Sequence, residues 1–577
     1  MLKLLKNFTK KDYLLIFICV ILVVFQVWLD LKLPDYMSEI TILVKTEGSQ
    51  MSDILEQGKY MMLCAGGSLV SAIFVGYLSS FISATFSKNI RKKLFEKVQN
   101  FSMEEINNFS TSSLITRTTN DITNIQRFIS MGLQLLIKSP IMAVWAVFKI
   151  LNKSWQWSAL TGAAVFILLI CVVVLIIVVM PRFKRVQKLI DNINGLTREN
   201  LTGIRVVRAF NAEKYQEDKF EVANKNLTRT NLFVNRIMTT MMPLMMFIMN
   251  AITLLIVWVG AHRINDGIIQ VGTMMAFMQY TMQIIMVFLM ISMVSVILPR
   301  AMVSAQRVSE VLNVDIAIKD SDNLQTFNHD EKGTIEFKNV SFRYPGADED
   351  VISNISFKAL SGKTTAFIGS TGSGKSTLIN LIPRFYDATK GEVKINGRNV
   401  KEYNIESLRN HVAVVMQKAL LFKGSIRDNM KWGKKDATDD EIMEALDISQ
   451  SREFVEKKDG KLDAFIDQGG KNLSGGQRQR LTIARAMVRK PDILILDDSA
   501  SALDFATDAA LRKAIRGMKL SPTLFIVSQR AASLMHADKI IVLDDGKVAG
   551  IGTHDELLAG CEVYQEIYYS QFKKEAM

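Results

Sequence analysis

Long apolar runs dominate the first three hundred residues of the chain, and shorter alternating patterns follow them. Six of these runs are long enough to cross a bilayer, which takes about 20 helical residues. A buried helix of a water-soluble domain is the alternative for any single run, but six in succession favour a membrane region. The runs are Tyr13–Leu33, Tyr60–Phe86, Met131–Leu151, Ala159–Met180, Ile237–Ala261 and Gly272–Leu298.

Basic residues between the runs predict how this region is oriented. Loops rich in Lys and Arg stay on the cytoplasmic side of a membrane. The two long polar loops, 87–130 and 181–236, both open with basic clusters. We therefore expect both loops, both termini and everything after residue 300 to be cytoplasmic. The net charge of +13 lies largely beside apolar runs, which disfavours a nucleic-acid partner.

The polar parts of the first half predict helices that continue beyond the bilayer. Residues 1–12 carry four lysines among leucines, a pattern typical of a short interfacial helix. The long loops are helical in character, and each should have a tip that touches the second half of the chain. Our candidates for the tips are Phe109–Asp121 and Arg205–Asn211, with a plain solvated helical face as the alternative.

The second half has the pattern of an α/β domain. Residues 333–344 alternate apolar and polar positions, as a half-buried strand does. Further strands are predicted at Val412–Met416, Ile493–Leu496, Thr523–Val527 and Ile540–Leu543, with helical segments between them. The predicted organisation is an all-α, six-helix membrane region at 1–312, a polar linker at 313–332 and an α/β P-loop domain at 333–577.

A glycine loop follows the apolar run Thr365–Ile368 and matches G-x-x-x-x-G-K-[ST] at every fixed position. Strand before and helix after are the context in which such a loop cradles phosphates with its backbone N–H groups. An ordinary glycine-rich turn is the alternative, which the complete motif disfavours. Lys375 would reach the β- and γ-phosphates, and the Ser376 hydroxyl would bind Mg²⁺. The predicted ATP-binding residues of the loop are Gly369, Ser370, Thr371, Gly372, Ser373, Gly374, Lys375, Ser376 and Thr377.

Two later segments extend this chemistry. The apolar strand Ile493–Leu496 ends in two carboxylates, of which Asp497 is placed for the Mg²⁺ shell and Asp498 for a water. Between the glycine loop and this strand lies a second short motif, which leads into a predicted helix at Arg478–Val488 and resembles an anion site. Its residues are Leu473, Ser474, Gly475, Gly476 and Gln477.

Together these motifs resemble those of an ABC transporter half of the exporter type, over essentially the whole chain. The resemblance implies that two such chains sandwich two ATP molecules, each between the glycine loop of one chain and the Leu473–Gln477 motif of the other. It also implies an adenine-stacking role for Tyr344, with a core tyrosine as the alternative. It implies a Mg²⁺-linked role for Gln417 and D-loop roles for Ser501 and Asp504.

Two positions depart from the family pattern. Active members carry Glu where this chain has Asp498, and His where it has Gln529. A general base must lie within about 2.6–3.2 Å of its water, so a carboxylate one methylene shorter loses reach. The resemblance is therefore to the degenerate-site subunit of heterodimeric bacterial multidrug exporters in the plasma membrane. The implied partner is a second exporter half that supplies the consensus Glu and His.

The fifth and sixth runs are rich in methionine, which suits promiscuous apolar surfaces. We expect a cavity for lipophilic compounds, either drugs or lipids, although lipid-facing or core methionine is an equal alternative. Intramembrane polar residues usually face inward. A channel gated by ATP, or a regulatory subunit without pump activity, is the alternative function. The predicted cavity residues are Met242, Met246, Asn250, Gln279, Met282, Gln283 and Met286.

Overall fold

The computed structural model describes residues 4, 6–151, 155–320, 327, 333–499, 502–518 and 521–572. The chain divides into two compact units. The first comprises Met1–Gln99 and Thr111–Val314, and the second comprises Asn100–Ser110 and Asp315–Met577.

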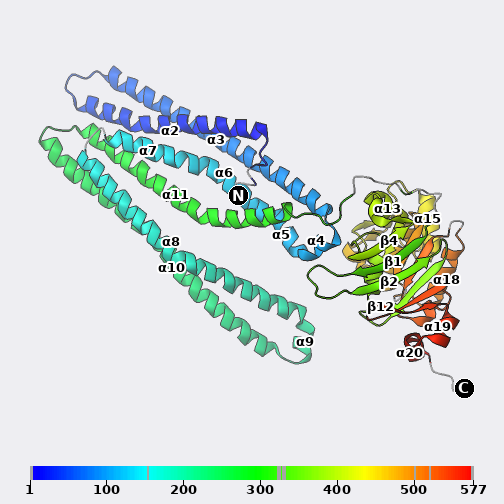
Figure 1. The fold of residues 1–577 in the computed structure, drawn as a ribbon. Helices are drawn as coiled ribbons and strands as arrows, with labels where there is room; N and C mark the ends of the chain where they lie inside the picture. Colours follow the sequence, from blue (N-terminus) through cyan, green and yellow to red (C-terminus); the bar gives the residue numbers. More distant parts are fainter. Residues whose placement is uncertain are drawn as a thin grey trace. The chain divides into compact units, whose positions relative to one another are not determined.

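Long helices make up the first unit (Figure 1). The helix α2 begins at Lys10, because Thr9 and Asp12 form a capping box in which the Thr9 hydroxyl accepts the Asp12 N–H at 3.2 Å. The predicted interfacial helix at 1–12 thus overlaps α2, and part of it lies outside the described residues. The helices are α2 (Lys10–Lys45), α3 (Met51–Gln99), α5 (Thr111–Thr116), α6 (Ile122–Met131), α7 (Ile137–Leu151), α8 (Trp155–Thr202), α9 (Ile204–Ala209), α10 (Glu213–Asn265) and α11 (Val271–Leu312), with π-turns at Arg117–Asp121 and Gly132–Leu136.

Four helical stretches among the described residues are long and apolar enough to cross a membrane: Lys10–Lys45, Met51–Gln99, Thr111–Leu151 and Glu213–Asn265. Two shorter apolar helical stretches, Trp157–Ile167 and Val271–Val287, overlap the other two predicted runs. The count of six crossings therefore remains a prediction. The helices extend well past the apolar runs, as expected for α3 and α8.

Two ion pairs lie among the apolar helices of the first unit. Lys138 Nζ of α7 is 2.9 Å from an oxygen of Asp30 on α2, and Lys149 Nζ is 2.6 Å from an oxygen of Asp35. The fully buried Tyr280 of α11 donates its hydroxyl to Asp35 at 2.7 Å. These polar contacts join α2, α7 and α11 inside a cluster of apolar side chains.

A six-stranded sheet forms the centre of the second unit, in the order β12-β11-β3-β10-β9-β6. Strands β11, β3, β10, β9 and β6 are parallel, and β12 is antiparallel to β11. All four strands that were predicted from short apolar runs are confirmed, as is the strand before the glycine loop. The strands are β3 (Thr364–Gly369), β6 (Val412–Val415), β9 (Ile493–Asp497), β10 (Thr523–Val527), β11 (Lys539–Asp544) and β12 (Lys547–Gly552).

A four-stranded antiparallel sheet, β2-β1-β4-β5, packs its apolar side chains with those of the central sheet. Its strands are β1 (Ile335–Phe342), β2 (Ile352–Ala359), β4 (Lys390–Ile395) and β5 (Arg398–Asn399), and β7 (Gly424–Ser425) pairs with β8 (Phe465–Ile466). The helices are α4 (Met103–Asn108), α12 (Lys375–Asn380), α13 (Ile405–His411), α14 (Ile426–Lys431), α15 (Asp439–Ile448), α16 (Arg452–Glu456), α17 (Gly475–Met487), α18 (Phe505–Arg516), α19 (His554–Gly560) and α20 (Glu562–Gln571).

The short helix α4 belongs to the second unit although it lies between helices of the first. Its Glu105 is buried and accepts the Ala317 N–H at 2.8 Å, and its Asn107 amide donates to the Tyr386 hydroxyl at 2.9 Å. These two contacts come from residues just before the predicted tip at Phe109–Asp121. Of that tip, Phe109 and Ser110 also belong to the second unit, and the rest belongs to the first unit, Thr111–Val314.

Candidate nucleotide-binding site

The central sheet gathers four loops at one edge. Strands β3, β10, β9 and β6 are parallel, so the residues that follow them emerge at the same side. In such sheets ligands bind outside the carboxyl ends of the strands. The four loops surround a pocket of about 360 Å³, which is lined by Val351, Thr371, Gly372, Gly374, Lys375, Ser376, Thr377, Gln417, Asp497, Asp498, Val527, Ser528 and Gln529.

The glycine loop after β3 has a conformation that requires glycine. Gly372 and Gly374 both have φ +90, a region that side chains disfavour. A Cβ atom on Gly374 would also lie 2.6 Å from a methyl carbon of Ile352. The backbone can therefore turn tightly around the pocket and present N–H groups to an anion.

Lys375 is held inside this loop by the loop itself. Its ammonium donates to the Gly369 carbonyl at 2.9 Å, the Ser370 carbonyl at 2.6 Å and the Ser373 hydroxyl at 3.1 Å. Burial lowers the pKa of Lys375, while the nearby Asp498 and Asp497 oppose that effect. A phosphate in the pocket would meet an ammonium that is already positioned.

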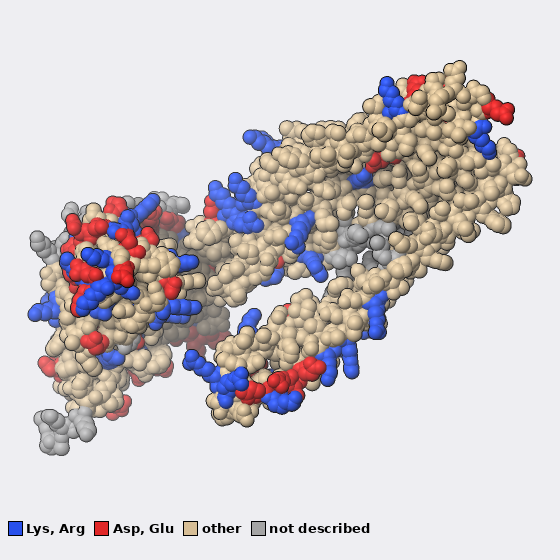
Figure 2. Space-filling model, turned by 180° about the vertical axis from the view of Figure 1, so that it is seen from behind, with Lys and Arg blue, Asp and Glu red and all other residues tan. Residues whose placement is uncertain are grey.

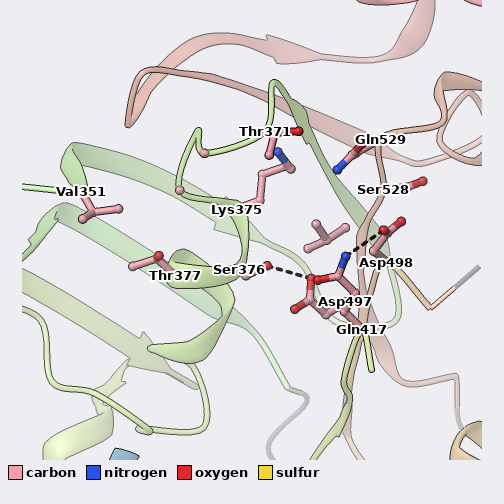
Figure 3. Close-up of a pocket in the computed structure, with 13 residues that line it drawn as sticks. Val351, Thr371, Lys375, Ser376, Thr377, Gln417, Asp497, Asp498, Ser528 and Gln529 are labelled. Carbon is pink, nitrogen blue, oxygen red and sulfur yellow. Dashed lines mark hydrogen bonds between the residues drawn. The ribbon is translucent and has the colours of Figure 1, made fainter. Parts of the chain in front are cut away.

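Ser376 and Asp497 fit a Mg²⁺ site. The Ser376 hydroxyl donates to an oxygen of Asp497 at 3.1 Å, so two oxygen ligands meet beside the loop (Figure 3). Hard cations such as Mg²⁺ prefer a few such oxygens together with phosphate oxygens and water. Burial raises the pKa of Asp497, and a cation beside it would favour the charged carboxylate.

Asp498 has an unusual backbone. Its φ of +44 lies in the left-handed region, which Asp tolerates better than most residues. One of its oxygens accepts the Gln417 amide N–H at 3.3 Å (Figure 3). Burial raises the pKa of Asp498, while the Gln417 hydrogen bond and the charges of Arg530 and Lys375 lower it. The predicted Gln417 is thus brought to the carboxylate pair.

Gln529 also lies at the pocket, on the segment that follows β10. Figure 3 shows its side-chain amide directed into the same space as Lys375 and Thr371. Its backbone carbonyl accepts the Gln571 amide at 2.7 Å, which ties this segment to the end of α20. An amide at this position can donate a hydrogen bond but carries no charge.

Tyr344 stands beside the pocket on the segment after β1. Its hydroxyl is 3.1 Å from that of Thr377, and its ring meets the Tyr386 ring edge to face, with centroids 5.3 Å apart. The ring is thus fixed next to the glycine loop, and its adenine-stacking role stays a prediction. Three lining residues were not predicted: Val351, Val527 and Ser528. Val527 ends a predicted strand, and Ser528 follows it directly.

The second motif lies elsewhere in the domain. Ser474 caps α17: its hydroxyl accepts the Gln477 N–H at 3.2 Å, and its own N–H donates to the Gln477 side chain at 3.1 Å. None of the described residues that line the pocket belongs to 473–477. A Cβ atom on Gly475 would meet nothing within 4 Å, so the start of α17 is open. Asp504 caps α18, and Ser501 lies outside the described residues.

The predicted cavity residues lie mostly on uncovered helix faces of the first unit. Gln283 differs, because its amide donates to the Asp30 carbonyl at 3.3 Å. The Met242 side chain lies outside the described residues. The exposed members are Met246, Asn250, Gln279, Met282 and Met286.

Comparison with known proteins agrees with this architecture. Residues 15–288 match the family model of the ABC transporter transmembrane region, and residues 352–501 match that of the ABC transporter. The chain is 39% identical over 542 residues to an uncharacterised ABC transporter ATP-binding protein of Mycobacterium tuberculosis, covering 93% of each chain. It is 29% identical to an ATP-dependent lipid A-core flippase of Syntrophus aciditrophicus, covering 87% of this chain and 83% of the flippase.

A solved structure shows the same fold. It is a bacterial Atm1-family ABC exporter with ATP bound, and it aligns with a TM-score of 0.82 at 20% identity, over 97% of this chain and 99% of that one. The glycine loop, the carboxylates after β9 and the separate α17 motif are therefore set in a known framework. The chain belongs to the ABC transporters, as an exporter half that fuses a helical transmembrane region to an ATP-hydrolysing nucleotide-binding domain.

Proposed function

We propose that this chain is one half of a heterodimeric exporter of amphipathic compounds in the bacterial plasma membrane. Its own pocket binds ATP and hydrolyses it weakly. Its α17 motif completes the hydrolysing site of the partner. The observation that carries the proposal is the pair Asp498 and Gln529, which line one pocket at the positions of the base and the switch.

The pocket separates into a binding part and a reacting part. Lys375 and the loop amides would hold the phosphates, and Ser376 and Asp497 would hold Mg²⁺, which neutralises phosphate charge when bound. On the reacting side, Asp498 is occupied by the Gln417 amide at 3.3 Å. Its carboxylate is one methylene shorter than the family's glutamate, and Gln529 supplies no cation. The binding part is complete, whereas the reacting part is weakened.

Dimerisation is supported by the incomplete pocket. The open start of α17 does not line the pocket of its own chain, and we assign it to the pocket of a second chain. The tip formed by α9 and its flanks also exposes large apolar side chains, among them Phe210 at 78% and Leu201 at 69%. Exposed apolar groups at a helical tip favour burial against another surface. We assign this tip to a nucleotide-binding domain.

The transported compound is assigned from the uncovered faces of α10 and α11. Met246, Met282 and Met286 are exposed there, and Asn250 and Gln279 add polar groups. A flexible thioether surface with few polar groups suits compounds that are lipophilic at one end and polar at the other. The lipid flippase among the relatives is consistent with such cargo.

Nucleotide retention tests the proposal. The complex with the partner half, isolated through a tag on this chain, is allowed to turn over with Mg²⁺ and ATP and is then desalted. We expect one intact ATP per heterodimer to remain, and Lys375→Ala in this chain to abolish it. Recovery of ADP alone from the unmodified complex would contradict a weakly hydrolysing site.

A further inference from the structure

The arm formed by α8 and α10 carries a groove whose chemistry the export cycle does not use. The two helices pack through an apolar seam of Val179, Val186 and Val234. Beside this seam lies a groove of about 390 Å³, here called the arginine groove, lined mainly by Arg182, Arg185, Asn226, Arg229, Thr230 and Phe233.

The lining residues recur at helical spacing on one face of each helix, next to the seam. The Arg182 guanidinium stacks on the Phe233 ring, 4.6 Å from its centroid, which fixes one charge against an aromatic wall. Asn226 and Thr230 add hydrogen-bonding side chains. Convergent guanidinium groups are well suited to phosphate, because they donate in a planar fork.

Acidic residues are missing from the two helical segments that form the groove, although Asp191 and Glu221 directly flank them, and Glu221 pairs with Lys225 at 3.5 Å. The segments 181–190 and 222–236 contain four and three basic residues and no Asp or Glu. Nearer the tip the pattern changes, since Arg208 pairs with Glu213 at 2.7 Å and Lys219 with Glu199 at 3.4 Å. Within the described part of the chain, Arg182, Arg185 and Arg229 form no ion pair. Figure 2 shows blue side chains without red neighbours along the middle of this arm, and mixed colours toward its tip.

The predicted apolar runs place the groove at the edge of the membrane region. Arg182 follows the apolar run Ala159–Met180 almost directly, and Arg236 directly precedes the run Ile237–Ala261. Both walls therefore change from apolar to basic at the same level. Lipid phosphates of the cytoplasmic leaflet occupy this level, and basic pockets between helices there bind anionic headgroups.

We propose that the arginine groove binds the phosphate headgroup of an anionic phospholipid in the cytoplasmic leaflet. Arg182, Arg185 and Arg229 contact the phosphate, and Asn226 and Thr230 contact the headgroup hydroxyls. The acyl chains lie along the apolar parts of α8 and α10. The lipid thus serves as a bound structural ligand of the arm, separate from any transported compound.

Native mass spectrometry of the purified protein in detergent, titrated with dioctanoyl phosphatidylglycerol, tests the assignment. The triple variant Arg182→Gln, Arg185→Gln, Arg229→Gln should bind this lipid about tenfold more weakly or worse. The matched control is Lys88→Gln, Arg91→Gln, Lys92→Gln, which removes three charges directly after the apolar run Tyr60–Phe86. It should bind like the unmodified protein, and both variants should keep ATP binding as a check on folding.

Two further probes distinguish a bound lipid headgroup from a soluble anion. Dioctanoyl phosphatidylcholine has a phosphate but no net charge, and it should bind weakly to all three proteins. Inorganic phosphate should fail to displace phosphatidylglycerol at equal concentration. An equal loss in both triple variants would overturn the groove in favour of diffuse charge. Displacement by inorganic phosphate would overturn it in favour of a soluble anion.

Discussion

Two surfaces of the nucleotide-binding domain, the pocket and the start of α17, differ in how completely they follow the family pattern. The pocket at the edge of the central sheet keeps Lys375, Ser376 and Asp497 but has Asp498 and Gln529 in its reacting part. The start of α17 keeps the whole Leu473–Gln477 motif, with Ser474 in place as a cap. Under the proposed function, the first surface holds a nucleotide and the second assists hydrolysis at the partner's site. One domain can therefore contribute unequally to two sites.

A substitution on the α17 surface should have the largest effect. Gly475→Glu adds an acidic side chain where nothing lies within 4 Å, so folding should be unaffected while the partner's phosphates are repelled. We expect turnover of the heterodimer to fall about 10²–10³-fold, the usual result of losing a phosphate-stabilising group. Gly560→Glu, at a second open and exposed glycine, is the control and should keep full turnover. Equal loss in both variants would mean misfolding.

A substitution at the contact between α4 and Tyr386 should have the second largest effect, because this contact links α4 to the aromatic rings beside the pocket. Asn107 donates to the Tyr386 hydroxyl at 2.9 Å, and the Tyr386 ring meets that of Tyr344 beside the pocket. Tyr386→Phe keeps the ring and removes this bond, worth about 1 kcal/mol or about fivefold. We expect that reduction in transport-stimulated ATPase activity. In a double-mutant cycle, adding Asn107→Ala should cause little further loss, whereas additive losses would separate the two residues.

Neutralising Asp498 should have a small effect on turnover. Removing a working general base costs about 10²–10⁴-fold. Because this carboxylate is short and already bonded to Gln417, Asp498→Asn should change heterodimer turnover by less than about threefold. The matched change in the partner's glutamate should abolish turnover. A large loss from Asp498→Asn would make this pocket a hydrolysing site and remove the contrast between the two surfaces.

The smallest expected effect is on stability. Burial raises the pKa of Asp498 above its ordinary value, so its charged form is disfavoured in the folded domain. Such a group contributes stability at low pH and loses it as the pH rises through the folded pKa. Asp498→Asn should therefore raise the melting temperature at neutral pH, with a difference that shrinks on acidification. A difference that grows on acidification would reverse the sign of this argument.

The predictable parts of the fold are those encoded in local sequence. Strand β3, the glycine loop and β9 follow from short apolar runs and fixed glycines, and the structure confirms them. The helix α4 was not predicted as a separate element, although its start has a recognisable sequence signal: Ser102 and Glu105 form a capping box. The left-handed backbone of Asp498 could not be predicted, because it depends on the turn that follows β9.

The ion pairs between α2 and α7 could not be predicted from the sequence either, because their partners are far apart in the chain. Asp30 and Lys138 are separated by 108 residues, and Asp35 and Lys149 by 114.

The separation between α2 and α7 in the chain has a consequence for biosynthesis. At a synthesis rate of about 5–20 residues per second, α2 waits roughly 5–20 s for α7 to emerge. During that time Asp30 and Asp35 have no cation from α7 in reach. We therefore expect the apolar run of α2 to enter the membrane by itself, and its packing against α7 to be fixed only after α7 has emerged.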